Sequence, residues 1–132
     1  MAGAPRGPDA HSDGDVVLHA LSDALLSAFG LGDIGDTFPP EDPRWRDLDS
    51  RHILAHVMAK VREHAHASEL VNVAVVVVLD APKLSAHRSA IRNSLADRLG
   101  LPGERVGLTF KTSEGLSPDH VQASVTLLVR TP

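Results

Sequence analysis

The chain of 132 residues contains no cysteine and no tyrosine, and its other aromatic residues are three Phe and one Trp. The lack of cysteine excludes disulfides, iron–sulfur clusters, thiolate zinc sites and cysteine nucleophiles. Any metal site must therefore use carboxylates and the eight histidines. Few aromatics and a formal net charge of −4 disfavour a nucleic-acid partner, because such proteins need stacking platforms and a basic surface.

Long apolar segments are also missing. No run approaches the roughly 20 residues of a membrane span, and the first residues lack the apolar core of a signal peptide. We therefore expect a cytoplasmic protein with no membrane partner. The length fits one domain, so we expect residues 1–10 to form a flexible leader, rich in Pro and Gly, and residues 11–132 to form a single domain.

Hydrophobic periodicity predicts an α/β (α+β) fold, a small mixed sheet covered by helices. The first helix is expected to be capped by Ser12 or Asp13 and to stop at Gly30. We expect helices over residues 15–29, 50–67 and 86–99, a loop over 36–47, and strands over 71–79, 106–111 and 121–129. The β-branched run without alternation over 71–79 predicts a strand buried on both faces. The last two strands are candidates for antiparallel neighbours, although the sequence does not fix their pairing.

Asp15, His19 and Asp23 recur at a spacing of four residues, which places them on one helix face. Imidazole and carboxylate ligands suit zinc, but an ordinary helix face with surface acids explains the same pattern. His52 and His56 form a similar pair without a converging carboxylate, so a solvated face is the better interpretation.

Three further segments could bind phosphate. Residues 11–15 (HSDGD) start the first helix, where backbone N–H groups, a hydroxyl and an imidazole suit an anion. Lys83 could meet a phosphate or cap the next helix. The segment 111–115 (KTSEG) follows a strand, where hydroxyls and a carboxylate could hold phosphate and a divalent ion, or form only a polar turn.

Together these segments resemble the 2-C-methyl-D-erythritol 2,4-cyclodiphosphate synthase family. The resemblance runs in order through residues 11–116. It rests on the long blocks HSDGDVVLHALSDALL (11–26) and LGDIG (31–35), and on the shorter matches FP (38–39), DP (42–43), DSR (49–51), NV (72–73), APKL (81–84) and TSEGL (112–116).

The resemblance implies a homotrimeric enzyme of the non-mevalonate isoprenoid pathway with sites between subunits. It cyclises a cytidine diphosphate (CDP)-linked methylerythritol phosphate and releases CMP. By resemblance, His11 and Ser12 orient the phosphates, and Thr112 stabilises the transition state together with His11. Asp33 and Gly35 hold the cytidine ribose, while the cytosine pocket is lined by Ala81, Pro82, Lys83 and Leu84. His19 is a zinc ligand and Glu114 carries magnesium.

Four features depart from the family pattern. The initial strand with its Asp-x-His zinc ligands is missing, and His11 of the Asp9-Ala10-His11 triplet already belongs to the phosphate motif, so the other zinc ligands stay unassigned. Pro40 replaces an Asp that contacts substrate, and Lys111 replaces a Thr beside the phosphates. Residues 117–121 (SPDHV) stand where the family has GFTGRGEG. These departures leave two alternatives open: a metal-independent cyclase of specialised metabolism, or an inactive paralogue that binds a nucleotide or a partner.

Overall fold

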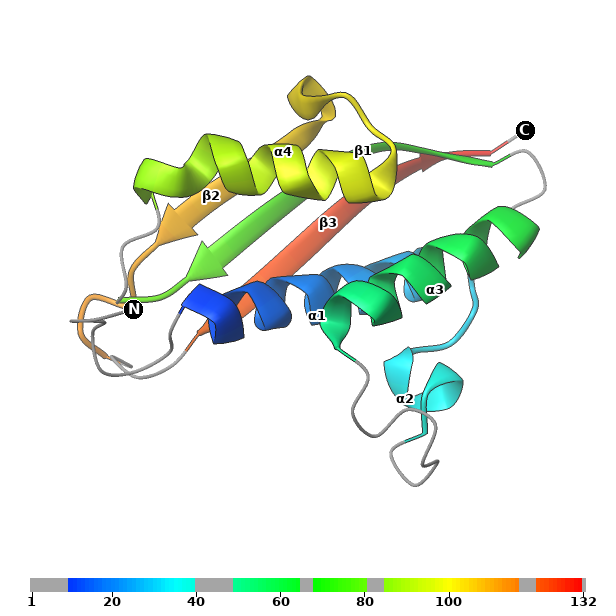
Figure 1. Cartoon of the computed structure of the whole chain (residues 1–132), viewed down its shortest axis with the longest axis horizontal. Coiled ribbons are helices and arrows are strands. Elements are labelled where there is room, and N and C mark those ends of the chain that lie inside the picture. Colours follow the sequence, from blue (N-terminus) through cyan, green and yellow to red (C-terminus); the bar gives the residue numbers. More distant parts are fainter. Residues whose placement is uncertain (1–9, 40–48, 65–67, 81–84, 117–120, 132) are drawn as a thin grey trace.

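The computed structural model describes residues 10–39, 49–64, 68–80, 85–116 and 121–131, and only the backbone of residues 10–14 and 85. The elements follow in the order α1 (Ala10–Ala28), α2 (Ile34–Thr37), α3 (Ser50–His64), β1 (Glu69–Val78), the 3₁₀ turn η2 (Ser85–His87), α4 (Arg88–Leu99), the 3₁₀ turn η3 (Gly103–Arg105), β2 (Val106–Lys111) and β3 (Gln122–Arg130). The predicted small mixed sheet covered by helices is confirmed (Figure 1).

The long helix α1 packs against α3 and β3. Its apolar side chains face both neighbours, and Leu21, Leu25 and Leu26 are fully buried. The helix ends where Gly30 takes a left-handed φ of 69° and the Leu31 N–H bonds the Leu26 carbonyl, a geometry that glycine adopts without strain. Its start differs from the expectation, because the chain is already helical at Ala10, the first described residue. Ser12 and Asp13 therefore lie within the helix and are not its cap.

The segment predicted as a loop from residue 36 begins inside a helix, because α2 covers Ile34–Thr37. Asp33 caps α2 by accepting from the Asp36 N–H, and the Asp36 carboxylate accepts from the Asp33 N–H. This reciprocal capping box stabilises a turn too short to persist alone. The Lys60 ammonium of α3 donates to the Thr37 hydroxyl and helps to fix α2 against α3.

The sheet has the strand order β2-β1-β3. β2 runs parallel to β1, with Val73 opposite Val106 and Val78 opposite Lys111, and β3 runs antiparallel to β1 on the other side. The expectation that the last two strands pair is therefore wrong, because β1 lies between them. α4 forms the crossover between the parallel strands and lies across β1 and β2 in Figure 1.

The helices of the described part of the chain cover one face of the sheet (Figure 1). On β1, Val73, Val75 and Val77 are buried against the helices, whereas Ala74 is exposed and Val76 half-buried. The prediction that this strand is buried on both faces is thus wrong for the single chain, since all the helices of the described part pack on the same side. We call the uncovered side the open face; it comprises residues 72, 74, 76 and 78 of β1, 107, 109 and 111 of β2, and 122, 124, 126 and 128 of β3.

Candidate functional site

Polar groups gather where β1 and β2 end side by side. Val78 lies opposite Lys111, and the Leu79 N–H donates to the Lys111 carbonyl at 2.9 Å. The two strands are parallel, so the residues that follow them, Asp80 and Thr112, leave the same edge of the sheet. Open α/β sheets usually bind ligands at this carboxyl edge.

The Asp80 carboxylate holds the turn that follows β2. Its Oδ1 accepts from the Ser113 N–H at 2.6 Å, and its Oδ2 accepts from the Ser113 hydroxyl at 2.7 Å and from the Gly115 N–H at 3.0 Å. These bonds favour the ionised carboxylate and lower the pKa of Asp80, led by the hydrogen bond from the Ser113 side chain. Ser113 and Gly115 flank Glu114, so Asp80 fixes the backbone on both sides of it.

Glu114 has a φ of 56°, in the left-handed region that costs a non-glycine residue about 1–3 kcal/mol. Its N–H donates to the Thr112 Oγ1 at 3.2 Å. The Thr112 hydroxyl hydrogen stays available for donation, because an oxygen that accepts one bond can still donate its own hydrogen. Lys111, Thr112 and Glu114 are all exposed. The end of β2 and the turn after it therefore carry an exposed ammonium group, a hydroxyl donor and a carboxylate within residues 111–114.

Asp33 and Gly35 lie on the other candidate surface, at the start of α2, and both are exposed. The Asp33 Oδ1 accepts from the Asp36 N–H at 2.8 Å. A Cβ added at Gly35 would lie 3.3 Å from the same oxygen, so glycine keeps this carboxylate unobstructed. Asp23 fixes the loop to α1, because its Oδ1 accepts from the Ile34 N–H at 2.8 Å.

The described residues do not form the three-ligand zinc site considered on α1. His19 is exposed, but the Asp23 carboxylate binds the α2 backbone, and the Asp15 carboxylate accepts from the Ser50 hydroxyl. Within residues 10–39, 49–64, 68–80, 85–116 and 121–131, no group of three or more His, Asp or Glu side chains is placed to hold a metal ion. The Glu114 carboxylate suits Mg²⁺ better than the described residues of α1 suit zinc, because Mg²⁺ is usually held by one or two carboxylates together with substrate phosphates.

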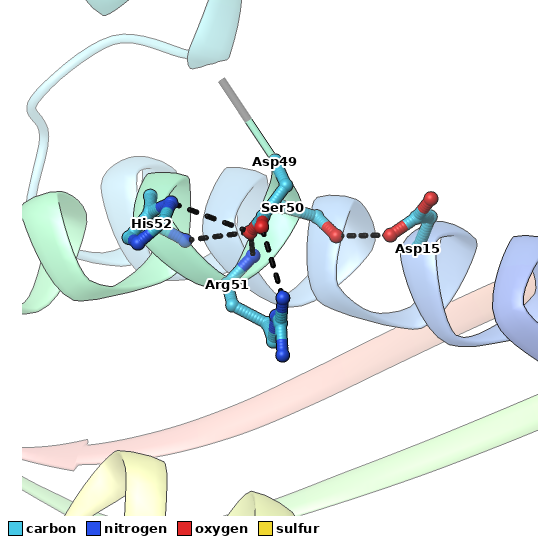
Figure 2. A network of polar contacts seen from close by, with 5 residues as sticks. All are labelled: Asp15, Asp49, Ser50, Arg51 and His52. Carbon is cyan, nitrogen blue, oxygen red and sulfur yellow. Dashed lines mark hydrogen bonds and ion pairs between the residues drawn. The ribbon is translucent and has the colours of Figure 1, made fainter. Parts of the chain in front are cut away.

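A second polar network begins α3 (Figure 2). The Asp49 carboxylate accepts from the Arg51 and His52 N–H groups and from the Arg51 guanidinium. The side-chain hydrogen bond from Arg51 is the main cause that lowers the pKa of Asp49 to about 2. His52 and His56 are exposed, as the solvated-face interpretation requires, and His56 contacts the edge of Phe38. Among the described residues, this network caps the start of α3.

The structure separates the candidate residues into two groups. Figure 1 places the turn after β2 at one end of the molecule and α2 away from it, below α1 and α3 in this view; Asp33 caps α2 and Gly35 lies within it. α1 begins on the side where β1 and β2 end, so the backbone of His11 and Ser12 lies toward the turn. The side chains of His11 and Ser12, and the whole of Ala81, Pro82, Lys83, Leu84 and Pro40, lie outside the described residues.

Two residues that shape these surfaces were not predicted in these roles: Asp80 was given no role, and Asp23 was considered only as a zinc ligand. Asp80 carried a recognisable signal, because an acid directly after a buried strand lies at the edge where ligands bind. Asp23 carried no such signal beyond its helical spacing, because its role as an acceptor for the Ile34 N–H depends on how α2 packs against α1.

A surface hollow of about 90 Å³ lies between α3 and α4, lined by Arg51, Leu54, Ala55 and Arg98. Small-molecule sites usually enclose about 300–1,000 Å³, so this hollow does not accommodate a nucleotide. No helix among the described residues is long and apolar enough to cross a membrane.

The fold and the edge cluster define an α/β protein with polar groups at the carboxyl ends of two parallel strands. The chain belongs to the YgbB family, whose model matches residues 2–130. It is 54% identical over 125 residues to a 2-C-methyl-D-erythritol 2,4-cyclodiphosphate synthase of Thermus thermophilus, covering 95% of this chain and 81% of the relative. It is 45% identical over 113 residues to the synthase of a Synechococcus species, covering 86% of this chain and 67% of that one.

A solved structure of this synthase in its CDP-bound form matches with a TM-score of 0.84 and 52% identity. The match covers 96% of this chain and 83% of the solved one. The resemblance drawn from the sequence motifs is thereby confirmed, and so is the fold class.

Proposed function

We propose that this chain is a 2-C-methyl-D-erythritol 2,4-cyclodiphosphate synthase of the non-mevalonate isoprenoid pathway. Its substrate would be a CDP-linked methylerythritol 2-phosphate, and its products the cyclic diphosphate and CMP. The observation that carries the proposal is the 54% identity to a named synthase over 95% of the chain. The turn at 112–115, held at the carboxyl edge of the sheet, supports it independently.

In this reaction an oxygen of the 2-phosphate attacks the β-phosphorus. The bond between that phosphorus and the oxygen bridging to the α-phosphate breaks, and CMP leaves with the bridging oxygen. Such a displacement requires little covalent chemistry from the protein. Catalysis depends on aligning the two phosphates and stabilising the charge on their oxygens.

The turn after β2 supplies groups of the required kind. The Thr112 hydroxyl can donate to a phosphate oxygen, and with His11 it would stabilise the transition state. Ser12 and the exposed Lys111 ammonium would hold the remaining phosphate oxygens. Glu114 would hold magnesium, which supplies charge neutralisation at the phosphates when bound. No step is assigned to zinc, because the described residues around His19 do not form its ligand set.

The nucleoside would be bound by two other segments. The exposed Asp33 carboxylate can accept from the ribose hydroxyls, and Gly35 leaves room beside it. Main-chain groups of residues 81–84 would bind the cytosine.

A homotrimer with sites between subunits accounts for the separation of these groups. One chain places α2, which Asp33 caps and which contains Gly35, apart from the turn after β2 (Figure 1), so a second subunit would complete each site. The open face supports this proposal, since it leaves Val76 half-buried and Leu128 55% exposed. A second subunit that covered this side of the sheet would bury these apolar side chains.

The decisive experiment measures CMP and cyclic diphosphate formed from 4-diphosphocytidyl-methylerythritol 2-phosphate, with Mg²⁺ and with a chelated control. We expect chelator-sensitive formation of both products. Thr112→Ala should lower turnover about 100-fold, the usual effect of removing one donor to a charged transition state. Thr131→Ala removes an exposed threonine after β3 and should leave turnover unchanged.

A folded wild-type protein that forms no CMP would overturn the proposed function. If that protein still bound CDP, it would be a nucleotide-binding member of the family. Unchanged turnover in Thr112→Ala would remove Thr112 from the mechanism.

A further inference from the structure

Asp80 is the residue at the carboxyl edge that the proposed chemistry does not use. It directly follows Leu79, whose N–H is bonded to the Lys111 carbonyl, so its backbone is anchored to the end of β2. It also directly precedes the segment 81–84. Its half-buried carboxylate points toward the turn after β2 and accepts from Ser113 and Gly115.

Asp80 forms hydrogen bonds with the residues directly before and directly after Glu114. The N–H groups of Ser113 and Gly115 both donate hydrogen bonds to the Asp80 carboxylate. The Glu114 N–H between them donates to the Thr112 hydroxyl oxygen. This arrangement keeps the left-handed φ of Glu114, which persists only where neighbouring contacts determine it. It also holds the Thr112 hydroxyl oxygen beside the backbone of Glu114.

We propose that Asp80 is a positioning residue for the cyclisation: its carboxylate holds the turn at 112–115 so that Thr112 and Glu114 meet the substrate phosphates together. This inference rests on the proposed function for the roles of Thr112 and Glu114. Asp80 itself touches no substrate. Its effect arises because a misplacement of about 1 Å in a catalytic group can cost about 100-fold in rate.

The substitution Asp80→Asn tests the carboxylate with minimal change in shape. An amide keeps one acceptor oxygen and replaces the other with an NH₂ group. If the NH₂ replaces Oδ1 it faces the Ser113 N–H, and if it replaces Oδ2 it faces the Gly115 N–H. In either orientation an NH₂ group faces a backbone N–H group, so two donors meet and one of the two backbone hydrogen bonds that hold the turn is lost. Ser113→Ala is milder, since it removes the hydroxyl bond and keeps both backbone bonds.

Glu69→Gln is the matched control. Glu69 begins β1, the strand that Asp80 follows, and forms an ion pair with Arg130 of β3 at the other end of the sheet. It is likewise a carboxylate paired across strands, but it lies far from the turn. Thermal unfolding of every variant reports the loss of stability separately from the loss of turnover.

The experiment measures kcat, KM and the Mg²⁺ concentration for half-maximal rate in the full-length protein. For Asp80→Asn we expect kcat to fall at least about tenfold while KM changes less than about threefold. The Mg²⁺ requirement should rise, Ser113→Ala should lie between this variant and the wild type, and Glu69→Gln should match the wild type. A kcat for Asp80→Asn within about twofold of the wild type, or a fall explained by unfolded protein, would overturn the proposal.

If the wild-type protein shows no turnover, the proposed function is wrong, and the positioning role of Asp80 is then tested by ligand binding. In that case the readout is CDP affinity with and without Mg²⁺. Positioning by Asp80 predicts that Asp80→Asn loses the Mg²⁺-dependent increase in CDP affinity and that Glu69→Gln keeps it. Equal Mg²⁺ dependence in both variants, or no CDP binding by the wild type, overturns the inference.

Discussion

The Ser50 hydroxyl donates a hydrogen bond to the Asp15 carboxylate and so joins α1 to α3 (Figure 2). Ser50 is only 3% exposed, so its hydroxyl depends on this acceptor. The contact also directs the Asp15 carboxylate toward α3. The helical spacing of Asp15, His19 and Asp23 therefore does not produce a shared metal site in the described part of the chain.

Loss of this contact should destabilise the fold. A hydrogen bond to a charged group contributes about 1.5–3 kcal/mol, so Ser50→Ala should lower the free energy of unfolding by about 2 kcal/mol in urea denaturation. Ser27→Ala, at an exposed position of α1, should change it by less than about 0.5 kcal/mol. A double-mutant cycle with Asp15→Asn isolates the pair, and additive losses would show that the two residues are not coupled.

Asp49 should contribute to stability in a defined pH range. Its pKa is lowered from 3.8 to about 2, so the folded state favours the ionised carboxylate. This stabilisation is complete above the unfolded pKa of about 3.9 and is lost as the pH falls toward 2. The difference in unfolding free energy between the wild type and Asp49→Asn should therefore shrink over that range. A carboxyl carbon of Asp49 that titrates near pH 4 in NMR would contradict the predicted shift.

Asp33 and Asp36 share a capping box, which allows the proposed ribose binding by Asp33 to be separated from helix capping. Asp33→Ala should lower CMP affinity about tenfold or more, because it removes a charged acceptor as well as the cap. Asp36→Ala should cost about 1 kcal/mol of stability or less and leave CMP affinity nearly unchanged. Isothermal titration with CMP tests both variants, and equal losses of affinity would indicate that Asp33 acts only as a cap.

The open face should be an interface between subunits. Leu128→Asp places a charge on this face and should convert the proposed trimer into monomers in sedimentation velocity experiments, since burying an unpaired charge is costly. Ala90→Asp makes the same kind of change on the exposed side of α4 and should preserve the trimer. A wild-type protein that sediments as a monomer would refute the trimer itself.

Local patterns in the sequence were sufficient for most elements. The helix predicted from residue 50 is α3, whose apolar side is buried, and Gly30 marked the end of α1. The short α2 was missed although its signal was present: Asp33 followed three residues later by Asp36 is a capping-box pattern.

Pairing across the sheet could not be predicted in this way. The run Val75–Val78 is equally apolar on both sides, and nothing local says that the helices cover only the side of Val75 and Val77. The position of β1 between β2 and β3 likewise depends on contacts between distant residues. The same limit hid the role of Asp80, whose acceptor contacts lie 33 and 35 residues further along the chain.

The position of β3 has a consequence for biosynthesis. β1 is the central strand, and its antiparallel partner lies as far as 61 residues away in sequence, between Glu69 and Arg130. Until residues 122–130 have been made, β1 has one unpaired and strongly apolar edge. An edge of this kind recruits other chains, so a nascent or prematurely terminated polypeptide is the form most prone to aggregate and most dependent on chaperones.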